Sequence, residues 1–249
     1  MYNIFCNVIE RNLLEGMNER HIRTVSLIGE AAFEKLKSSH IAIIGIGGVG
    51  SYTAEALCRC GVGRLTIIDN DTVSTSNINR QLPALTSTVG RKKVDVMKER
   101  MTDINPDAQI TGLDIFLDEN NIPDIPWSEF DYVIDCIDSV KSKLSIIKIC
   151  KEKDVPIISS MGTGNKLDPS KFEICDITKT SVCPLARVMR RELKNMGIPH
   201  HTVLYSKEEP VHVSLDENGR HAPASISFVP SVAGLMLAGY AVNELIKKT

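Results

Sequence analysis

Residues 36–71 read LKSSHIAIIGIGGVGSYTAEALCRCGVGRLTIIDND, and this stretch predicts the fold. Ile41–Ile44 is a short apolar run before a glycine cluster, Val49–Cys60 is typical of a helix, and Leu65–Ile68 is a second apolar run. Gly61 ends the helix, because glycine accepts the left-handed conformation that a C-cap needs. Strand, glycine turn, helix and strand form a βαβ unit with a right-handed crossover. Strands that are apolar throughout indicate a sheet covered on both faces.

The alternation of strand and helix continues beyond this unit. Further helices are predicted at residues 92–104 and 140–153, and further strands at 108–115, 132–138 and 155–161. After Gly164 three short strands are predicted outside this regular alternation, at residues 172–177, 202–209 and 225–230. We therefore predict an α/β protein with a Rossmann-like doubly wound sheet, parallel in the N-terminal half and mixed toward the C-terminus. We expect one domain over residues 1–249, with a helical lead-in at 1–38 and a substrate- and dimer-facing part at 165–249.

The composition is that of an ordinary globular protein. Hydrophobic residues make up 43% of the 249 residues and the formal net charge is -2, so nucleic acid could contact only a local basic patch. Seven scattered cysteines without a C-x-x-C pair indicate reduced thiols, and we expect a cytoplasmic protein without a targeting segment. The apolar run ISFVPSVAGLMLAGYAV, residues 226–242, is taken as too short to cross a membrane. We expect it to form a buried helix that begins after Pro230.

The glycine cluster is a candidate phosphate-binding turn. Residues 45–50 read GIGGVG and fit the pattern G-x-G-x-x-G between a predicted strand and a predicted helix. Glycines let the backbone approach phosphate, and the helix N-terminus supplies free N–H groups. Asp69 lies about 20 residues further on, where an acid that binds ribose is expected. A tight turn without a ligand is the alternative, and the motif alone does not separate NAD from ATP.

Two cations favour ATP chemistry over NAD chemistry. An enzyme that attacks the α-phosphate of ATP must stabilise charge on the phosphate and on the leaving pyrophosphate, which calls for fixed cations and a metal ion. Arg80, in the sequence SNINRQ, and Lys93, in GRKKVD, are the candidates. Their alternatives are an exposed loop arginine and a solvated helix N-terminus. Asp135 and Asp138 end another strand, where a carboxylate can reach a metal on the phosphates, although Asp138 could instead be a helix N-cap.

Six ordered motifs resemble the ubiquitin-activating-enzyme-like adenylyltransferase (ThiF) family. They are RHIRTVSLIG, IAIIGIGGVGS, DNDTVSTSNINRQ, GRKKVD, INPDAQI and DCIDSVKSK, and the resemblance runs from about Arg20 to the C-terminus. It implies ATP, magnesium, adenylation of a substrate carboxylate with release of pyrophosphate, and a homodimer. It also implies that Arg23 reaches the active site of the neighbouring subunit. The nucleotide-binding residues that the motif and the resemblance imply are Gly45, Gly47, Gly48, Gly50, Asp69, Asp71, Ser76, Asn77, Asn79, Arg80, Gln81, Lys93, Asp138 and Ser139, with Arg80, Lys93 and Arg23 catalytic and Asp138 also the magnesium ligand.

The C-terminal part suggests a branch of the family. Sulfur-carrier adenylyltransferases often hold structural zinc with two C-x-x-C pairs, which this chain lacks, so a tetrahedral cysteine site is excluded. DITKTSVCPLARVMRRELKNMGI and SISFVPSVAGLMLAGYAV resemble the tRNA threonylcarbamoyladenosine dehydratase branch. This resemblance implies ATP-dependent cyclisation of the modified tRNA nucleoside, with a sulfur-relay protein as a possible partner. The alternatives are activation of a ubiquitin-like sulfur carrier, an NAD-binding redox protein and a silent nucleotide-binding adaptor.

A helix expected at residues 184–196 carries a basic stripe. Arg187, Arg190, Arg191 and Lys194 follow the spacing i, i+3, i+4, i+7 and share one face, with Leu185, Met189 and Met196 expected on the other. Such a stripe can follow the phosphates of tRNA, although an ordinary solvated face is the alternative. Cys183 precedes the helix and could be a nucleophile, but no base for it is identifiable, and we take it as structural.

Overall fold

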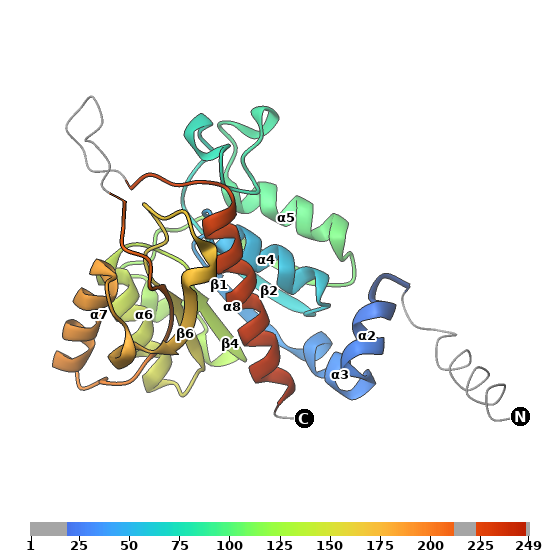
Figure 1. Ribbon diagram of the computed structural model, residues 1–249. Helices are drawn as coiled ribbons and strands as arrows, with labels where there is room; N and C mark the ends of the chain where they lie inside the picture. Colours follow the sequence, from blue (N-terminus) through green and yellow to red (C-terminus); the bar gives the residue numbers. More distant parts are fainter. Residues whose placement is uncertain (1–18, 212–222, 248–249) are drawn as a thin grey trace, which may run out of the picture.

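The computed structural model describes residues 19–211 and 223–247 of the chain (Figure 1). The described part of the predicted helical lead-in is helical, comprising η1 (Glu19–His21), α2 (Ile22–Ile28) and α3 (Glu30–Ser38). The remainder of that lead-in, residues 1–18, lies outside the described residues. The helices α2 and α3 lie to one side of the sheet, far from α6 and α7 (Figure 1).

Seven strands form one sheet in the order β3-β2-β1-β4-β5-β7-β6. Their bounds are β1 (His40–Ile44), β2 (Arg64–Ile68), β3 (Gln109–Leu113), β4 (Tyr132–Asp135), β5 (Ile157–Ser160), β6 (Phe172–Asp176) and β7 (Thr202–Ser206). All neighbouring pairs are parallel except β6 and β7, which are antiparallel. The prediction of a sheet that is parallel first and mixed toward the C-terminus is therefore confirmed.

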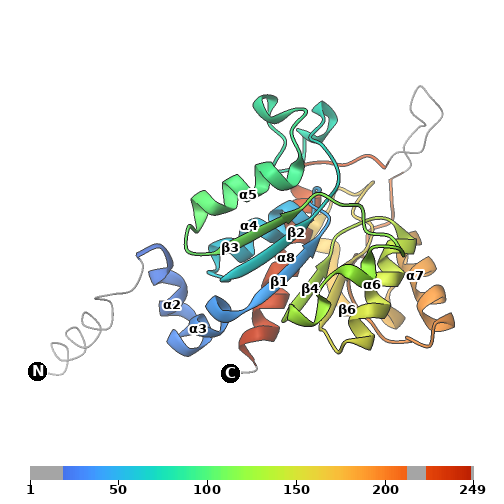
Figure 2. The same ribbon diagram turned by 180° about the vertical axis from the view of Figure 1, so that it is seen from behind.

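Helices cover both faces of the sheet (Figures 1 and 2). The first face packs against α4 (Gly50–Arg59), α5 (Lys93–Ile104) and α8 (Phe228–Ile246). The second packs against α6 (Val140–Glu152) and α7 (Pro184–Asn195). Ile41 and Ile43 of β1 enter the first core, while Ala42 and Ile44 enter the second. Because successive side chains of a strand point to opposite faces, the buried part of β1, Ile41–Ile44, has to be apolar throughout.

The last helix corrects two predictions. Residues 225–230 were expected to form a strand, but α8 begins at Phe228, and the helix therefore starts before Pro230 and not after it. Pro230 lies in the first helical turn, where its missing N–H has no partner to lose. At 19 residues α8 is also long and apolar enough to cross a membrane, contrary to the prediction from length. Eight of its residues are buried inside the protein, and it packs closely against α4.

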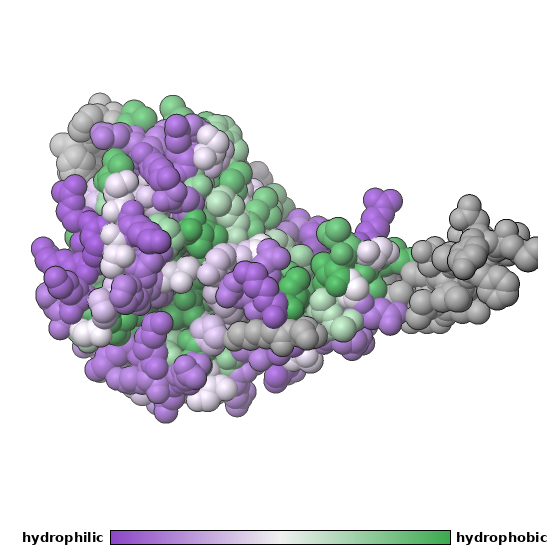
Figure 3. Space-filling model, turned by 60° about the horizontal axis from the view of Figure 1, so that its bottom comes forward, coloured by the Kyte–Doolittle hydropathy of each residue, from purple (hydrophilic) through white to green (hydrophobic). Residues whose placement is uncertain are grey.

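Some large apolar side chains stay exposed on the described surface. Leu27 of α2 is 85% exposed and Leu235 of α8 is 50% exposed, which is far above the exposure of the core. Apolar surface is visible both on the arm formed by α2 and α3 and on the main body (Figure 3). Large apolar side chains with this much exposure are found on faces that a partner covers.

Candidate active site

A cavity of about 420 Å³ lies where β1, β2 and β4 end. Its walls come from the residues that follow these strands, with further residues from the loop after β3 and from the start of α8. In an open α/β sheet ligands bind outside the carboxyl ends of the strands, where the strand order reverses. In this sheet the reversal falls between β1 and β4, so the cavity occupies the position that the topology favours.

The four glycines of the turn fall into two groups, three that allow close packing and one that leaves space open. Gly45 has φ +87, and a Cβ on Gly50 would lie 1.8 Å from the carbonyl oxygen of Gly45. A Cβ on Gly48 would lie 3.2 Å from Pro230, whereas one on Gly47 would meet nothing closer than 3.8 Å. Gly45, Gly48 and Gly50 therefore permit close packing, and Gly47 leaves open space. Since Gly47 and Gly48 line the cavity, side chains at these positions would enter the space that phosphates need.

Asp69 fastens the glycine turn to the end of β2. Its Oδ2 accepts a hydrogen bond of 2.6 Å from the backbone N–H of Ile46, and its Oδ1 accepts one of 2.8 Å from the N–H of Asp71. Burial raises the pKa of Asp69, while the positive charge of Lys93 and the two backbone donors oppose that rise. Because both carboxylate oxygens already accept bonds, Asp69 shapes the turn, and its contact with ribose remains a prediction.

Lys93 is a buried cation on the cavity wall. It is the first residue of α5 and is only 4% exposed, so the alternative of a solvated helix N-terminus is wrong. Its Nζ lies 2.7 Å from Asp71 Oδ2 and 4.0 Å from Asp69 Oδ1. Asp71 is largely exposed, which leaves this ion pair open to the cavity. Lys93 can therefore contact a phosphate without moving far.

Arg80, Asn77 and Gln81 line the same cavity. The Arg80 Nη1 atom donates to the carbonyl of Ser76 at 2.9 Å and to Asn79 Oδ1 at 2.8 Å. Gln81 is 8% exposed, and its Oε1 has no hydrogen-bond partner among the described residues. Buried polar atoms nearly always have a partner, so this oxygen fits a site that receives a ligand.

Asp135, the last residue of β4, and Asp138, three residues further on, have different positions. Asp138 is exposed and lines the cavity, and it is not a helix cap, because Ser139 is the N-cap of α6 and accepts from the Ser142 N–H. Asp135 is fully buried and accepts a hydrogen bond of 2.7 Å from Lys143 Nζ. It does not line the cavity, so the prediction that its carboxylate can reach a metal on the phosphates is wrong. Magnesium in nucleotide sites needs only one or two carboxylates beside the phosphates, and Asp138 fits this requirement. Among the described residues no group of three or more possible metal ligands occurs.

Some predicted site residues lie off the cavity wall. Gly50 lies beneath the turn, Ser76 exposes a hydroxyl bonded to Ser74, and Asn79 bonds to Arg80 and to the carbonyl of Ser225. Arg23 is an exposed residue of α2 and does not line this cavity. The remaining predicted residues do line it, namely Gly45, Gly47, Gly48, Asp69, Asp71, Asn77, Arg80, Gln81, Lys93, Asp138 and Ser139.

Several cavity residues were not predicted. They are Ile115, Phe116, Leu117, Cys136, Ile137, Thr163, Ser225 and Pro230, together with a few residues adjacent to the predicted motifs. The loop after β3 could have been found, since it leaves the same edge of the sheet as the loops after β1 and β2. Thr163, Ser225 and Pro230 have no sequence signal for nucleotide binding, and only the tertiary fold brings them to the cavity.

The predicted basic stripe is only partly free. Arg187 and Lys194 are exposed, Arg191 pairs with Glu192, and Arg190 turns inward and donates to Thr180. The buried face of α7 consists of Ala186, Met189 and Leu193, so the placement of Met196 on that face is wrong.

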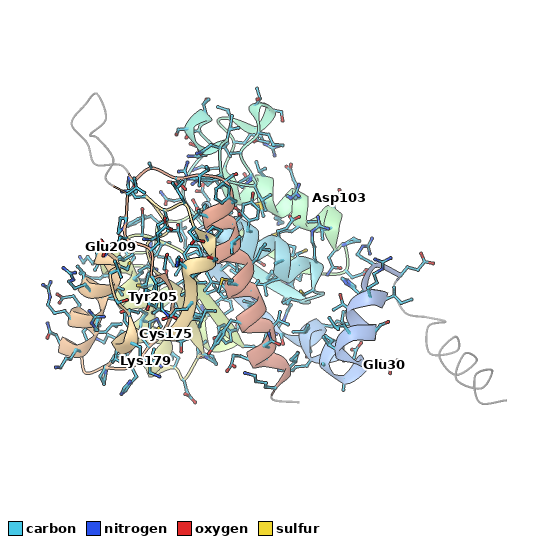
Figure 4. All side chains as sticks on the ribbon, viewed as in Figure 1. Glu30, Asp103, Cys175, Lys179, Tyr205 and Glu209 are labelled. Carbon is cyan, nitrogen blue, oxygen red and sulfur yellow. The ribbon has the colours of Figure 1, made fainter. Side chains whose placement is uncertain are left out.

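Cys183 is 3% exposed at the N-cap of α7, in agreement with a structural role. Lys179 and Cys175 lie in the same half of the molecule as this helix (Figure 4). His201 directly precedes β7, is buried, and forms a hydrogen bond with the Ser159 hydroxyl.

The comparison with known families agrees with this geometry. The sequence model of the ThiF family matches residues 18–249. The chain belongs to the ThiF family. This match confirms the resemblance that the six motifs indicate, and it extends over all of the described residues.

Several relatives of this ThiF-family chain are tRNA threonylcarbamoyladenosine dehydratases by name. A tRNA threonylcarbamoyladenosine dehydratase of Bacillus subtilis is 43% identical over 233 residues, which cover 88% of this chain and 92% of that protein. The crystal structure of the Escherichia coli tRNA N6-threonylcarbamoyladenosine dehydratase in complex with AMP superposes with a TM-score of 0.86 at 34% identity. It covers 92% of this chain and 95% of the E. coli chain, and the complex with ATP superposes with a TM-score of 0.85.

Sulfur-carrier enzymes are similar over a shorter stretch. The E. coli molybdopterin-synthase adenylyltransferase is 38% identical over 126 residues, or 51% of this chain and 50% of that protein. The similarity to this ThiF-family chain thus covers about half of each protein. The Bacillus subtilis dehydratase matches over 88% of the chain, a larger share than the 51% of the molybdopterin-synthase adenylyltransferase.

Proposed function

We propose that this ThiF-family protein catalyses the ATP-dependent cyclisation of threonylcarbamoyladenosine in tRNA to the hydantoin form. One observation carries the proposal, namely the 43% identity to a named dehydratase over 92% of that protein's length. The cavity supports it, because Arg80, Lys93 and Asp138 surround a space large enough for a nucleotide. Activation of a sulfur carrier is the weaker candidate, since two such enzymes match at 38% identity over 51% of the chain and 35% over 64%, against 43% over 88% for the Bacillus subtilis dehydratase.

In the first step the threonyl carboxylate attacks the α-phosphorus of ATP, and the bond to pyrophosphate breaks. Negative charge grows on the oxygens of the α-phosphate and on the departing pyrophosphate. Arg80 and Lys93 stabilise this charge from fixed positions, and fixed charges cost little reorganisation during the reaction. The backbone N–H groups at the start of α4 add a partial positive charge at the glycine turn.

In the second step the carbamoyl nitrogen of the same nucleoside attacks the activated carbonyl carbon. The bond to AMP breaks, the nitrogen loses its proton, and the five-membered ring closes with net loss of one water. Because nucleophile and electrophile belong to one molecule, ring closure benefits from a high effective concentration. No enzyme nucleophile is needed, which agrees with the buried position of Cys183.

We assign magnesium to Asp138. Its exposed carboxylate lines the cavity and is not used as a helix cap. When bound, magnesium neutralises phosphate charge and orients the oxygens of the triphosphate. Asp138 thus positions the metal, while Arg80 and Lys93 carry the protein's own positive charge.

We also propose a cytoplasmic homodimer in which each chain is a single domain over residues 1–249. Exposed Leu27 on α2 and exposed Leu235 on α8 favour a partner surface, and residues 165–249 are assigned to substrate and dimer contacts. Arg23 lies on the same arm as Leu27 and is available to reach a neighbouring subunit. A sulfur-relay protein is proposed as a further partner. Sedimentation of the purified protein tests the dimer, and a monomer at micromolar concentration contradicts it.

The test of the reaction is a mass measurement. The protein is incubated with ATP, magnesium and tRNA that carries the linear modification, and the nucleosides are then analysed by mass spectrometry. We expect the modified nucleoside to become lighter by one water, in equal amount with AMP. No loss of water, with pyrophosphate exchange that depends on an added sulfur-carrier protein, overturns the proposal.

We propose that α7 contacts tRNA phosphates through Arg187, Arg191 and Lys194, while Arg190 holds the fold. The double variant Arg187→Glu, Arg191→Glu should weaken tRNA binding and leave ATP binding unchanged, because each lost phosphate contact weakens binding regardless of sequence. The matched control reverses two exposed lysines of other helices, Lys98→Glu and Lys148→Glu. Equal weakening by both pairs contradicts a specific role for α7.

A further inference from the structure

Among the described residues, one nitrogen of Arg80 holds its guanidinium in place. Nη1 donates to the Ser76 carbonyl and to Asn79 Oδ1, whereas Nε and Nη2 have no hydrogen-bond partner in this part of the chain. A guanidinium carries five N–H groups, so three of them stay available for phosphate. The stem of Arg80 passes over the glycine turn, 3.5 Å from the position of a Cβ on Gly48. The direction of the free N–H groups therefore depends on what holds Nη1.

Asn79 uses both ends of its side-chain amide. Oδ1 accepts from Arg80 at 2.8 Å, and Nδ2 donates to the carbonyl of Ser225 at 3.0 Å. The network fixes the orientation of the amide, because a flipped amide would set donor against donor at Arg80 and acceptor against acceptor at Ser225. Asn79 thus connects the phosphate-binding loop to a segment that lies near the end of the chain.

That segment is itself clamped by Asn165. The backbone N–H of Asn165 donates to the Ala224 carbonyl at 2.7 Å, and Asn165 Oδ1 accepts from the Ala224 N–H at 2.7 Å. Asn165 has φ +58, a left-handed conformation that asparagine tolerates better than most residues. Pro223 lies against Gly164, where a Cβ would meet it at 2.6 Å. Residues 223–225 are therefore fixed at the rim of the nucleotide cavity.

Ser225 also separates two cavities. It lines the nucleotide cavity and a second, mostly apolar cavity of about 270 Å³ that is lined in addition by Asn165, Leu167 and Ile226. Any displacement of this shared wall also moves the Ser225 carbonyl, which accepts the hydrogen bond from Asn79 Nδ2. The placement of Arg80 is thus connected to a region outside the nucleotide cavity through two hydrogen bonds.

We propose that Asn79 is a positioning residue that aims Arg80 at the phosphates, with the Asn165–Ala224 clamp as its fixed support. The inference rests on the proposed function of the cavity, since it assigns Arg80 to phosphate. It departs from the sequence-based expectation that Asn79 binds nucleotide itself, because Asn79 does not line the cavity. A misplacement of about 1 Å is enough to reduce a rate by roughly 100-fold, so two hydrogen bonds of this kind matter.

The test is a double-mutant cycle of Asn79→Ala and Arg80→Ala. One readout is the ratio of the dissociation constants of adenosine and ATP, which reports phosphate contacts without any tRNA. The other is kcat for the loss of water. Asn79→Ala should lower both by roughly 10- to 100-fold in the wild-type background and by less than about twofold when Arg80 is already alanine. Additive effects, or an unchanged ratio in Asn79→Ala, overturn the proposal.

Two further variants separate positioning from folding. Asn79→Asp keeps the acceptor for Arg80 but sets a carboxylate against the Ser225 carbonyl, so its effect should lie between wild type and Asn79→Ala. Asn165→Gly removes the side-chain acceptor without strain at φ +58 and should reproduce the direction of Asn79→Ala. Asn120→Ala, an exposed amide in the loop after β3, is the control and should change neither readout. An effect of Asn165→Gly that persists in the Arg80→Ala background overturns the role of the clamp.

The cycle distinguishes this inference from the proposed function. If the tRNA is not the substrate, wild-type protein releases no water, but the adenosine-to-ATP ratio still responds to Asn79. If the tRNA is the substrate and Asn79 does not position Arg80, water loss proceeds and the cycle is additive. Melting temperatures of all variants identify a protein that fails to fold, in which case Asn79→Asp, the smallest change in shape, replaces Asn79→Ala in the cycle.

Discussion

Two lysine–aspartate pairs in this protein have the same distance and different surroundings. Lys93 lies 2.7 Å from Asp71, and Lys143 lies 2.7 Å from Asp135. Both lysine side chains are almost fully buried, but Asp71 is 60% exposed whereas Asp135 is 0% exposed. The first pair faces the cavity, and the second is enclosed between β4 and α6. The Lys93–Asp71 pair, with one exposed partner, is therefore placed to bind a ligand, whereas the Lys143–Asp135 pair, with both partners buried, is placed to stabilise the fold.

The largest expected effect is on the enclosed pair. Lys143→Met leaves Asp135 as a buried charge without its cation, which should lower the free energy of unfolding by about 3–5 kcal/mol. Urea unfolding measures the loss. The double variant Asp135→Leu, Lys143→Met should recover part of it, because an apolar replacement of the whole pair leaves no buried charge. A double variant that is less stable than Lys143→Met shows that Asp135 is needed for more than this pair.

The next effect concerns the open pair. Lys93→Met should reduce kcat for the loss of water by roughly 100- to 1,000-fold, the range seen when one fixed donor to a developing charge is removed. Its free energy of unfolding should change much less than that of Lys143→Met, because the partner Asp71 is solvated. Steady-state kinetics and urea unfolding of both variants make the comparison. Similar rates in Lys93→Met and wild type contradict a catalytic role.

A pH effect extends the comparison to a third buried group. Burial, with the nearby charges of Lys151 and Lys143, lowers the pKa of His201 to about 3. In the unfolded chain His201 binds a proton below about pH 6.5, whereas in the folded protein it does so only near pH 3. The contribution of neutral His201 to the free energy of unfolding is therefore fully present above about pH 6.5 and is lost as the pH falls toward 3. Between pH 6.5 and 5 the expected loss is about 2 kcal/mol, at about 1.4 kcal/mol per pH unit.

His201→Gln should remove this contribution, since glutamine can still bond to Ser159 but does not titrate in this range. Urea unfolding of both proteins at pH 5 and pH 7.5 gives the difference, in which the carboxylates common to both cancel. The same pH dependence in both proteins contradicts the assignment to His201.

The smallest effect is expected at the exposed acid. Asp71→Ala removes the exposed partner of Lys93 but should cost much less stability than Lys143→Met, because the Asp69 carboxylate stays 4.0 Å from the Lys93 ammonium group. ATP should still bind, because phosphate can replace the lost carboxylate beside Lys93. Calorimetric titration with ATP and urea unfolding check the two statements. A loss of stability as large as that of Lys143→Met removes the distinction between the open pair and the enclosed pair.

The nucleotide half was predictable because its signals are local. Each segment of the βαβ unit favours its own conformation, namely Ile41–Ile44, the glycines after it and Leu65–Ile68. Because these segments follow one another closely in the sequence, they also lie close together in space. Arg80 and Lys93 were found because the chemistry of phosphate calls for cations near such a turn. Lys143 was missed as the partner of Asp135, since sequence shows that an acid ends a strand but not how deep it lies.

The C-terminal part was harder because its structure depends on distant contacts. SISFV alternates small polar and apolar residues and favours a strand locally, yet Phe228 begins a helix whose apolar residues are buried against α4 and the sheet. Arg190 could not be told from Arg187 by helical spacing, and only its bond to Thr180 separates them. The role of Ser225 could not be predicted from its side chain, because it acts through its backbone carbonyl.

The contact between Gly48 and Pro230 also has a consequence for synthesis of the chain. The glycine turn leaves the ribosome well before Ser225 and Pro230, which close the opposite wall and come much later in the sequence. A nascent chain therefore carries a phosphate turn without a complete cavity. Since a ligand stabilises only the state that binds it, ATP in the cell stabilises finished chains and gives no help to unfinished ones.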